Sequence, residues 1–353
     1  MSPFYALLFL IMVVMERELP HDGFIIQAQF KLSIMAMIGF QASHEQYPPS
    51  EVLAQVVKAE RAGFTFINSS DHFHPWSERQ GHSGYSFAWL GAAMQATKLP
   101  YGVVCAPGQR NHPAIVAQAA ATLAEMFPGR FFLSLGSGEA LNESITGEKW
   151  PIKAERNKRL RESAEVIRKL FAGETVTYHG RVVVEGAKLY SLPETLPLLY
   201  GAAVTEETAA WMGSWADGLT TVHKPLNELE NTVKAFRSGG GVGKPMILKV
   251  QLSYARSEEE AISGAYDQWR TNIFSGTVLG DLERVEQFDA LGEFVTMDKL
   301  KEMVNISSDI NVHIDLIQSY INLGFDKIIL HNVNREQDCF ISDFAEKVLP
   351  RFT

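Results

Sequence analysis

The sequence predicts an α/β fold in which a single (β/α)8 TIM barrel with insertions occupies residues 30–353. Three observations support this fold. Apolar runs rich in β-branched and aromatic residues alternate with helical segments, which is typical of parallel βαβ units. Eight such strands can be placed, as a barrel of this class requires. No repeat, low-complexity tract or linker divides the chain into two domains.

The first half of the chain is interpreted as four strand–helix units that are complete by Phe171. Gly63 ends the first helix, because glycine readily adopts the left-handed conformation found there. The third helix is rich in alanine, which has the highest helix propensity. The predicted strands are Leu32–Phe40, Phe64–Asn68, Tyr101–Cys105 and Arg130–Leu135, and the first three helices are Pro49–Gly63, Tyr85–Lys98 and His112–Phe127.

The second half continues the alternation after one interruption. Val176–Tyr190 alternates β-type residues around His179-Gly180, which predicts a hairpin inserted into the barrel. Phe274–Glu302 has no clear period and is predicted to be an insertion or lid. The remaining strands are expected at Leu198–Ala203, Asp217–Val222, Pro245–Tyr254 and Lys327–His331, and the helices at Glu206–Trp215, Leu226–Phe236, Glu258–Arg270, His313–Leu323 and Glu336–Leu349.

The composition excludes several classes of protein. With 46% hydrophobic and 21% charged residues, the 353-residue chain is an ordinary globular protein. A net charge of -9 argues against a nucleic-acid partner, which requires a basic surface. Cys105 and Cys339 are far apart and lack any metal-binding spacing. Because this usage suits a reducing compartment, we expect a cytoplasmic protein.

The first residues do not fit the barrel pattern. Pro3 to Val14 is nearly all apolar but too short to span a bilayer comfortably. It also lacks the basic leader and the small-residue cleavage site of a signal peptide. We therefore expect no membrane association and interpret residues 1–29 as an extension outside the fold, with Met12, Met15 or Met35 as the natural start.

Polar clusters follow two of the predicted strands. Asp71 and His72 come after the second strand, and Glu139 follows the fourth. Because barrel active sites are built where strands end, we expect these side chains to converge. His72 suits proton transfer near neutral pH, and Glu139 is a second acid or base. The structural alternative is that Asp71 caps a loop and Glu139 begins a helix, where the dipole favours a carboxylate.

A metal site is a weaker interpretation of the same residues. His72 and His74 form a His-x-His pair like that of some metal-dependent barrel hydrolases, and His331 is the one further ligand at a strand end. Gly136-Ser137-Gly138 lacks the full dinucleotide-binding fingerprint. As a turn, it allows the backbone to approach a ligand closely.

Three more side chains have two readings each. Thr205 and Thr208 either seat a phosphate with the free amides of a helix terminus or form an ordinary N-cap. Trp76 either walls a ligand site or fills the core. These alternatives stay open on the residues alone.

Several short motifs occur together along the chain. They are Ser70-Asp71-His72-Phe73-x-Pro75-Trp76, Asn111-x-Pro113-Ala114, Ala117-Gln118-Ala119, Pro128-x-Arg130, Gly136-x-Gly138-Glu139-Ala140-Leu141-Asn142-Glu143 and Ala216-Asp217-Gly218. Through these motifs the chain from about Phe30 to its end resembles the luciferase-like flavin and deazaflavin oxidoreductases, in the branch of the coenzyme F420-dependent glucose-6-phosphate dehydrogenases. This family implies a barrel that holds the ring of F420 or FMN and passes hydride directly between the cofactor and a substrate carbon.

The resemblance also implies roles for individual residues. His72 would exchange the proton of the substrate hydroxyl, Trp76 would wall the ring site, and Glu139 would balance protons at the pyrimidine side of the cofactor. The implied cofactor contacts are Asp71, Cys105, Ala106, Ser137, Gly138, Asn142, Val204, Thr205 and Thr208.

The departures from the family pattern bear on the ligands. Val204-Thr205 stands where the sugar-phosphate enzymes have a glycine pair, and Val103–Pro107 fits a sister group that uses ordinary flavin, so F420 and FMN are equally expected. Thr221 and Lys224 match residues that hold the substrate phosphate, but two further basic residues have no counterpart in Phe274–Glu302. We therefore expect a small alcohol or sugar-like substrate rather than glucose 6-phosphate.

The resemblance further implies a homodimer that acts on a small molecule. The alternatives are a flavin-dependent monooxygenase of the same family, a metal-dependent barrel hydrolase, and a cofactor-binding protein that has lost catalysis. The first would use the same residues around the ring, whereas the second would require a bound metal ion.

Overall fold

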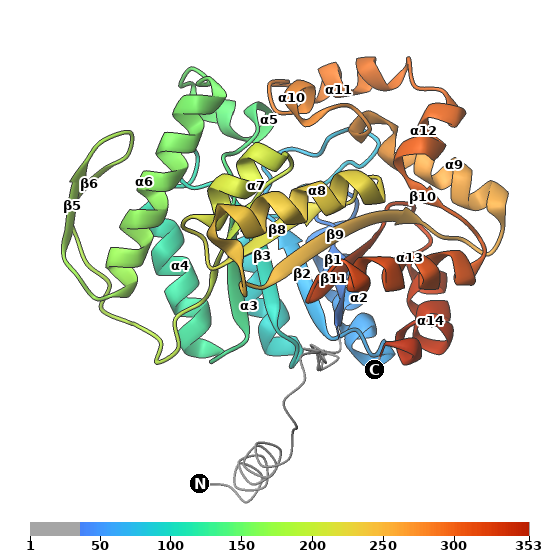
Figure 1. Cartoon of the computed structure of the whole chain (residues 1–353), viewed down its shortest axis with the longest axis horizontal. Coiled ribbons are helices and arrows are strands. Elements are labelled where there is room, and N and C mark those ends of the chain that lie inside the picture. The colour runs from blue at the N-terminus through green and yellow to red at the C-terminus, as the bar shows by residue number, and fades with distance from the viewer. Residues whose placement is uncertain (1–35, 353) are drawn as a thin grey trace, which may run out of the picture. The chain divides into compact units, whose positions relative to one another are not determined.

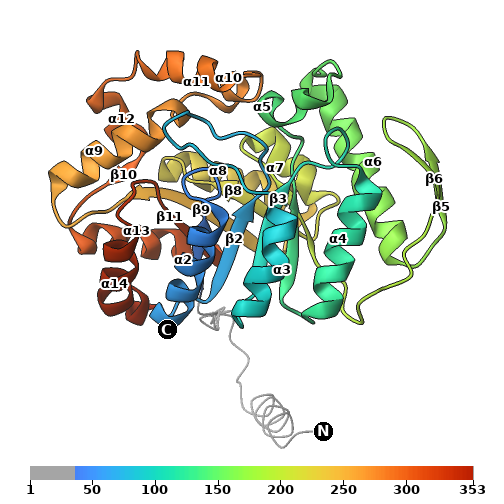
Figure 2. The same cartoon turned by 180° about the vertical axis from the view of Figure 1, so that it is seen from behind.

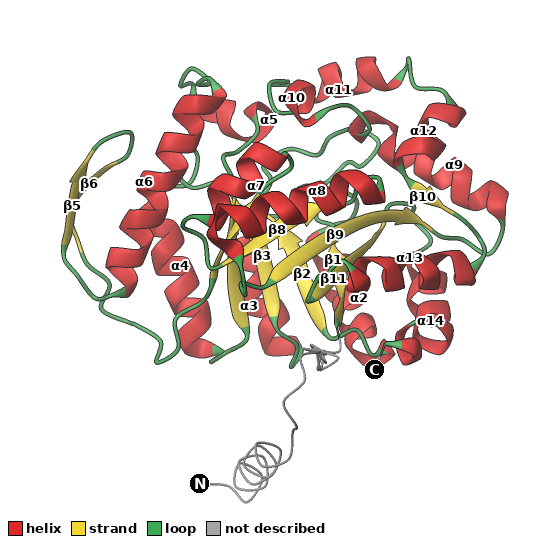
Figure 3. Cartoon of the chain, in the orientation of Figure 1, coloured by secondary structure: helices red, strands yellow, loops and turns green. Residues whose placement is uncertain are grey.

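The computed structural model describes residues 36–352, and the predicted barrel is confirmed (Figures 1 and 3). Within this range eight parallel strands close into a ring, because β11 pairs with β1 and β8 pairs with β9. The predicted extension, residues 1–29, lies outside the described residues. The barrel strands are β1 (Met37–Ala42), β2 (Phe66–Ser70), β3 (Tyr101–Cys105), β4 (Phe131–Leu135), β7 (Leu199–Ala202), β8 (Gly218–Val222), β9 (Met246–Ser253) and β11 (Lys327–Asn332).

Helices surround the barrel, and Figure 2 shows α2, α3 and α4 side by side on one flank. No helix within residues 36–352 is both long and apolar enough to cross a membrane. The helices between the strands and after the last one are α2 (Pro49–Ala62), α3 (Ser86–Ala96), α4 (Pro113–Met126), α6 (Lys153–Phe171), α7 (Glu206–Gly213), α8 (Leu226–Phe236), α9 (Glu258–Trp269), α13 (Ile310–Asn322) and α14 (Gln337–Lys347).

Two inserted segments extend the barrel. The predicted hairpin is confirmed as β5 (Val176–His179) and β6 (Val183–Ala187), which lie beyond α6 at the edge of the molecule (Figure 1). The segment predicted to be an insertion or lid contains three helices, which are α10 (Gly276–Leu279), α11 (Val285–Gly292) and α12 (Met297–Met303). Figure 1 shows these helices together above the strands, near the short helix α5 (Ala140–Glu143).

Several predicted boundaries were displaced. The second strand runs two residues further than expected and ends at Ser70, so Asp71 is the first residue after it. The first strand runs through Ala42 rather than ending at Phe40. As a result, the polar segment Ser43–Gln46 also follows a strand directly. A two-residue strand, β10 (Asn305–Ile306), pairs with β9 and was not expected.

Side chains that point inward at the amino-terminal end of the barrel are apolar. The rings of Phe132 and Tyr200 meet edge-to-face with centroids 5.5 Å apart, an arrangement that contributes about 0.5–1.5 kcal/mol beyond burial. Gly102 is required beside them, because a Cβ there would collide with the Phe132 ring. We call this buried group the aromatic plug, and it consists of Phe66, Phe132, Tyr200, Ile247 and Ile329.

Towards the carboxyl ends of the strands the barrel interior becomes polar. Ser134 and Thr220 hydrogen-bond to each other across 2.8 Å, and Asn68 Nδ2 donates to Gln41 Oε1 at 2.8 Å. Solvent reaches this end, because inward-facing residues on β3, β7, β8 and β9 stay partly exposed while the plug is buried. We call these partly exposed residues the mouth floor, and they are Val104, Ala202, Val222, Lys249 and Gln251.

Candidate active site

His72 and Glu45 form an ion pair at the barrel mouth. Glu45 lies three residues after β1, and His72 lies two residues after β2. The Nδ1 atom of His72 donates to Glu45 Oε1 at 2.5 Å. The Glu45 side chain is only 2% exposed, whereas that of His72 is 17% exposed. Because Nδ1 is engaged, Nε2 is the ring nitrogen available to a ligand.

The pair shifts both pKa values towards the charged forms. Burial raises the pKa of Glu45, but its hydrogen bond to His72 and the nearby positive charges outweigh burial and lower the pKa to about 2. Burial lowers the pKa of His72, yet the hydrogen bond and charge of Glu45 leave that pKa raised above its usual value of 6.5. His72 is therefore poised to hold a proton near neutral pH.

Trp76 connects this pair to the predicted second acid. Its ring meets the His72 imidazole edge-to-face with centroids 4.6 Å apart. Its indole Nε1 donates to Glu139 Oε2 at 3.3 Å. On its other side, Trp76 packs edge-to-face against Trp269 at 5.6 Å. The structure thus brings Glu45, His72 and Glu139, from the loops after β1, β2 and β4, to one place.

Asp71 belongs to a buried ionic network beneath this site. Its Oδ2 accepts hydrogen bonds from Arg110 Nη2 at 2.9 Å and from Asn111 Nδ2 at 2.6 Å. Glu143 Oε1 lies 3.6 Å from Arg110 Nε. The side chains of Asp71, Arg110 and Glu143 are all at least nine-tenths buried. Within the described residues, Asp71 Oδ1 is buried without a hydrogen-bond partner.

The loop after β4 approaches Asp71 and His72 closely. Asn142 Oδ1 accepts from the backbone N–H groups of Phe73 and His74, at 2.8 and 3.1 Å. Gly138 has a φ of 84°, in the left-handed region, and a Cβ there would crowd Ala106. Ser137 and Ala106 lie beside it and are partly exposed. That Ala106, Ser137, Gly138 and Asn142 contact a cofactor stays a prediction.

Cys105 is placed differently. Its side chain points outward into the apolar cluster between barrel and helices, and its carbonyl accepts from the Gly136 N–H at 2.9 Å. Burial raises the pKa of this thiol well above its usual value. Cys105 could therefore contact a ligand in the barrel only through its backbone atoms.

The residues predicted to hold phosphate, Thr205 and Thr208, lie at the start of α7, which follows β7. Thr205 caps α7, since its Oγ1 accepts from the Thr208 N–H at 3.2 Å. The first turn of α7 carries Glu206 and Glu207, which already complement the helix dipole. The N-cap reading is confirmed. That Thr205 and Thr208 bind a phosphate remains a prediction. Glu206 and Glu207 oppose it, because their charges would repel a phosphate group.

The predicted substrate residues have their own partners. Lys224 Nζ donates to the Val204 carbonyl and lies 3.4 Å from Thr232 Oγ1. Val204 is 46% exposed. Thr221 Oγ1 is buried and has no hydrogen-bond partner among residues 36–352. Thr220, rather than Thr221, faces the barrel interior, because it bonds with Ser134.

The histidines considered as metal ligands do not converge. His74 Nδ1 bonds with the Leu141 carbonyl at 2.9 Å, while His72 Nδ1 bonds with Glu45. His331 Nε2 contacts Gln46 Oε1 at 3.1 Å, and burial lowers its pKa well below 6.5. No group of three His, Cys, Asp or Glu side chains within the described part of the chain could hold a metal ion.

The inserted helices cover the loops that carry this site. Trp76 and Leu141 belong to a second apolar cluster with residues of the insertion such as Phe288. Polar contacts add to this packing, because Ser77 Oγ donates to Asp289 at 2.6 Å. The insertion therefore fixes the position of Trp76, and so does Trp269 at the end of α9.

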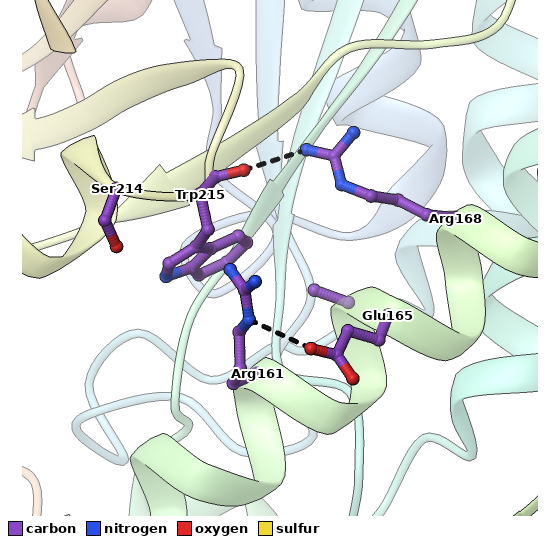
Figure 4. Close-up of a pocket in the computed structure, with 6 residues that line it drawn as sticks. Arg161, Glu165, Arg168, Ser214 and Trp215 are labelled. Atoms are coloured by element: carbon purple, nitrogen blue, oxygen red, sulfur yellow. Dashed lines mark hydrogen bonds and ion pairs between the residues drawn. The ribbon is translucent and has the colours of Figure 1, made fainter. Parts of the chain in front are cut away.

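A separate surface pocket of about 250 Å³ lies between α6 and the segment after α7 (Figure 4). Arg161 lies over the Trp215 ring and bonds with Glu165, and Arg168 donates to the Trp215 carbonyl at 3.1 Å. None of the predicted site residues lines this pocket. Trp215 packs here on the outer side of the barrel.

Two charged residues of the mouth were not among the predicted site residues. Glu45 is the partner of His72, and Lys249 lies on the mouth floor in β9. Burial lowers the pKa of Lys249, while the charges of Glu45 and Glu139 act in the opposite direction. Lys249 thus belongs to the same electrostatic cluster as the acid–base residues.

We expect Glu45→Gln to lower the pKa of His72, since a neighbouring opposite charge favours the charged form of the imidazole. Without the carboxylate, burial and Lys249 would both favour the neutral imidazole. NMR titration of the ring, assigned by comparison with His72→Ala, measures the shift. His223, whose pKa of about 4 depends on burial, is the internal control and should not move. An unchanged His72 pKa would contradict the assigned cause.

Comparison with known proteins places this fold and site in one class. The family model for luciferase-like monooxygenases matches residues 30–327. The chain therefore belongs to the luciferase-like family, and it is an enzyme, an oxidoreductase. The resemblance seen in the sequence motifs is confirmed.

Particular relatives are similar over nearly the whole chain. The F420-dependent glucose-6-phosphate dehydrogenase of Beutenbergia cavernae is 32% identical over 328 residues, covering 90% of this chain and 97% of that protein. The enzyme of the same name from Segniliparus rotundus is 33% identical over 334 residues, covering 91% and 99%. A solved F420-dependent secondary alcohol dehydrogenase in complex with an F420–acetone adduct superposes with a TM-score of 0.84 at 29% identity, covering 90% and 99%.

Proposed function

We propose that this protein transfers a hydride between a small hydroxylated substrate and F420, with FMN as the second candidate cofactor. The observation that carries the proposal is the row of contacts from Glu45 through His72 and Trp76 to Glu139 at the barrel mouth. Similarity to dehydrogenases named for F420 supports the choice of cofactor.

The residues around the mouth fit a cofactor. Asp71 Oδ1 is buried without a partner within residues 36–352, so an atom of a bound molecule would satisfy it. Gly138, which has a left-handed backbone and no side chain, allows the backbone of this loop to approach a ligand closely. We propose that Asp71, Ser137, Gly138 and Asn142 hold the cofactor. When bound, F420 or FMN accepts or supplies the hydride, while the protein supplies orientation and proton transfer.

His72 handles the substrate proton in this proposal. Removing hydride from an alcohol carbon leaves a carbonyl only when a base takes the hydroxyl proton. His72 Nε2 is the receiving atom, because Nδ1 donates to Glu45. The raised pKa of His72 keeps the imidazole protonated below that pKa. Carbonyl reduction is therefore favoured near neutral pH, and alcohol oxidation accelerates as the pH rises through the pKa of His72.

The substrate is proposed to be a small alcohol rather than a sugar phosphate. Lys224, the one basic residue that matched a phosphate ligand, already donates to the Val204 carbonyl. Glu206 and Glu228 add negative charge near it. A phosphate group would have to overcome both features, whereas a neutral hydroxyl would not.

Parallel titration with F420 and FMN tests the cofactor. We expect F420 fluorescence to be quenched at a lower protein concentration than is needed to bind FMN. Tighter binding of FMN, together with oxygen consumption, would favour the monooxygenase alternative. Failure to bind either ring would remove the proposal, and normal F420 affinity without turnover on any alcohol or ketone would indicate a protein that has lost catalysis.

We expect Glu139→Gln to change the pH profile of kcat more than the KM for substrate. Glutamine keeps an oxygen that can accept from Trp76 Nε1, so the packing is retained while the charge is lost. The expected loss in kcat is about 10²-fold, the lower end for a positioned acid or base. Steady-state kinetics across pH measure it. A change confined to KM would reassign Glu139 to substrate binding.

A cytoplasmic location and a homodimer remain predictions that accompany this function. They derive from the cysteine usage and from the family resemblance. Light scattering coupled to size-exclusion chromatography measures the assembly, and a mass near that of one 39.3 kDa chain would contradict the dimer.

A further inference from the structure

The position of Lys249 suits the binding of a substrate, and the fold does not require a positive charge there. It occupies the fourth position of β9, opposite Val222 of β8 and Ile329 of β11. Leu248 and Val250, on either side of it, belong to the cluster between barrel and helices. Lys249 therefore points inward, one alternation above the buried Ile247 of the aromatic plug.

The ammonium group of Lys249 lacks a close polar partner. Within residues 36–352, its only charged neighbours act from a distance, and they are Glu45 and Glu139. The charge of Lys249 in turn reaches the His72 imidazole. The side chain is partly exposed, so solvent reaches it from the mouth. A cation without a hydrogen-bond acceptor of its own offers its donors to an incoming molecule.

We propose that Lys249 binds the carboxylate of a small hydroxy acid whose hydroxyl lies at His72. This inference rests on the proposed function, because it extends the substrate site described there. The carboxylate accepts a charge-assisted hydrogen bond from Nζ, while the hydroxyl of the adjacent carbon faces His72 Nε2. The substrate class is therefore 2-hydroxy acids and the corresponding 2-oxo acids.

The charge balance favours a monoanion. One lysine supplies a single positive charge, and the His72–Glu45 pair is neutral overall when the imidazole is protonated. Glu139 adds a negative charge nearby. Glu45 and Glu139 would repel a doubly charged phosphate more strongly than a singly charged carboxylate.

The test compares lactate with propane-1,2-diol, which has the same carbon skeleton without the charge, by isothermal titration calorimetry. It is run on the cofactor-free protein and on the F420-loaded protein, with inorganic phosphate as a third ligand. We expect lactate to bind about 10- to 100-fold more tightly than the diol, the change expected for a charge-assisted hydrogen bond. Lys249→Met should abolish this preference and leave diol binding unchanged, whereas Lys249→Arg should keep it.

Lys327→Met is the matched control, since Lys327 lies at the opposite end of the barrel over the Phe132 ring. It should not alter the preference for lactate. Equal affinity for lactate and diol, tighter binding of phosphate, or a preference that survives in Lys249→Met would overturn the assignment. Failure to bind F420 or FMN would contradict the proposed function but not the role of Lys249. The preference of the cofactor-free protein for lactate would still test that role.

Discussion

His72→Ala is expected to reduce hydride transfer by roughly 10²- to 10⁴-fold, the range for loss of a positioned general acid or base. Its imidazole is the partly exposed member of the ion pair, so its removal takes away the proton acceptor while leaving the buried ionic network around Asp71 intact. Stopped-flow measurement of cofactor reduction gives the rate of transfer. Cofactor affinity, measured separately by fluorescence, should stay within a few-fold of the wild type.

His74→Ala is the matched control for this variant. It removes the same ring from the same loop, but His74 bonds with the Leu141 carbonyl and has no contact with Glu45. Its rate should remain much closer to that of the wild type. If both variants lost the same activity, the loop and not the His72 proton would be responsible.

Asp71→Ala is expected to lower the free energy of unfolding by about 3 kcal/mol, because it leaves a buried arginine without its main partner. Arg110 is only 9% exposed, and after the change its remaining carboxylate neighbour is Glu143 at 3.6 Å. Urea unfolding of the cofactor-free protein, followed by circular dichroism, measures the loss.

The double variant Asp71→Ala/Arg110→Met separates charge from packing. Removing both ions eliminates the unpaired buried charge, so part of the lost stability should return. Asp71→Asn keeps the size and one acceptor oxygen and should lie between the wild type and Asp71→Ala. A double variant less stable than the single one would mean that the network is not the source of the loss.

Most of the barrel was predictable because its strands are apolar and its helices are long enough to show a period. The boundaries of β3 (Tyr101–Cys105) and α8 (Leu226–Phe236) were predicted to the residue. The helices of the insertion were not predicted, because α10, α11 and α12 have only 4, 8 and 7 residues. A helical period requires a window of about 11–18 residues.

Residues of the candidate site could be predicted from the sequence only where a polar cluster follows a strand whose end was predicted nearly correctly. Glu45 carries the same signal as His72, but the first strand was expected to end at Phe40, so the residues after Ala42 were not considered. Lys249 lies inside a predicted strand whose polar residues recur at alternate positions, a sign of a polar inner face. The contact between Trp76 and Glu139 joins residues 63 apart, and no local pattern reports such a distance.

The aromatic plug has a kinetic consequence. Within the described part of the molecule, the aromatic plug closes one end of the barrel, so cofactor and substrate would both enter through the other end. The one that binds deeper in the barrel must then bind first and leave last. Turnover should accordingly follow a compulsory order, with one product blocking the exit of the other until it has diffused away.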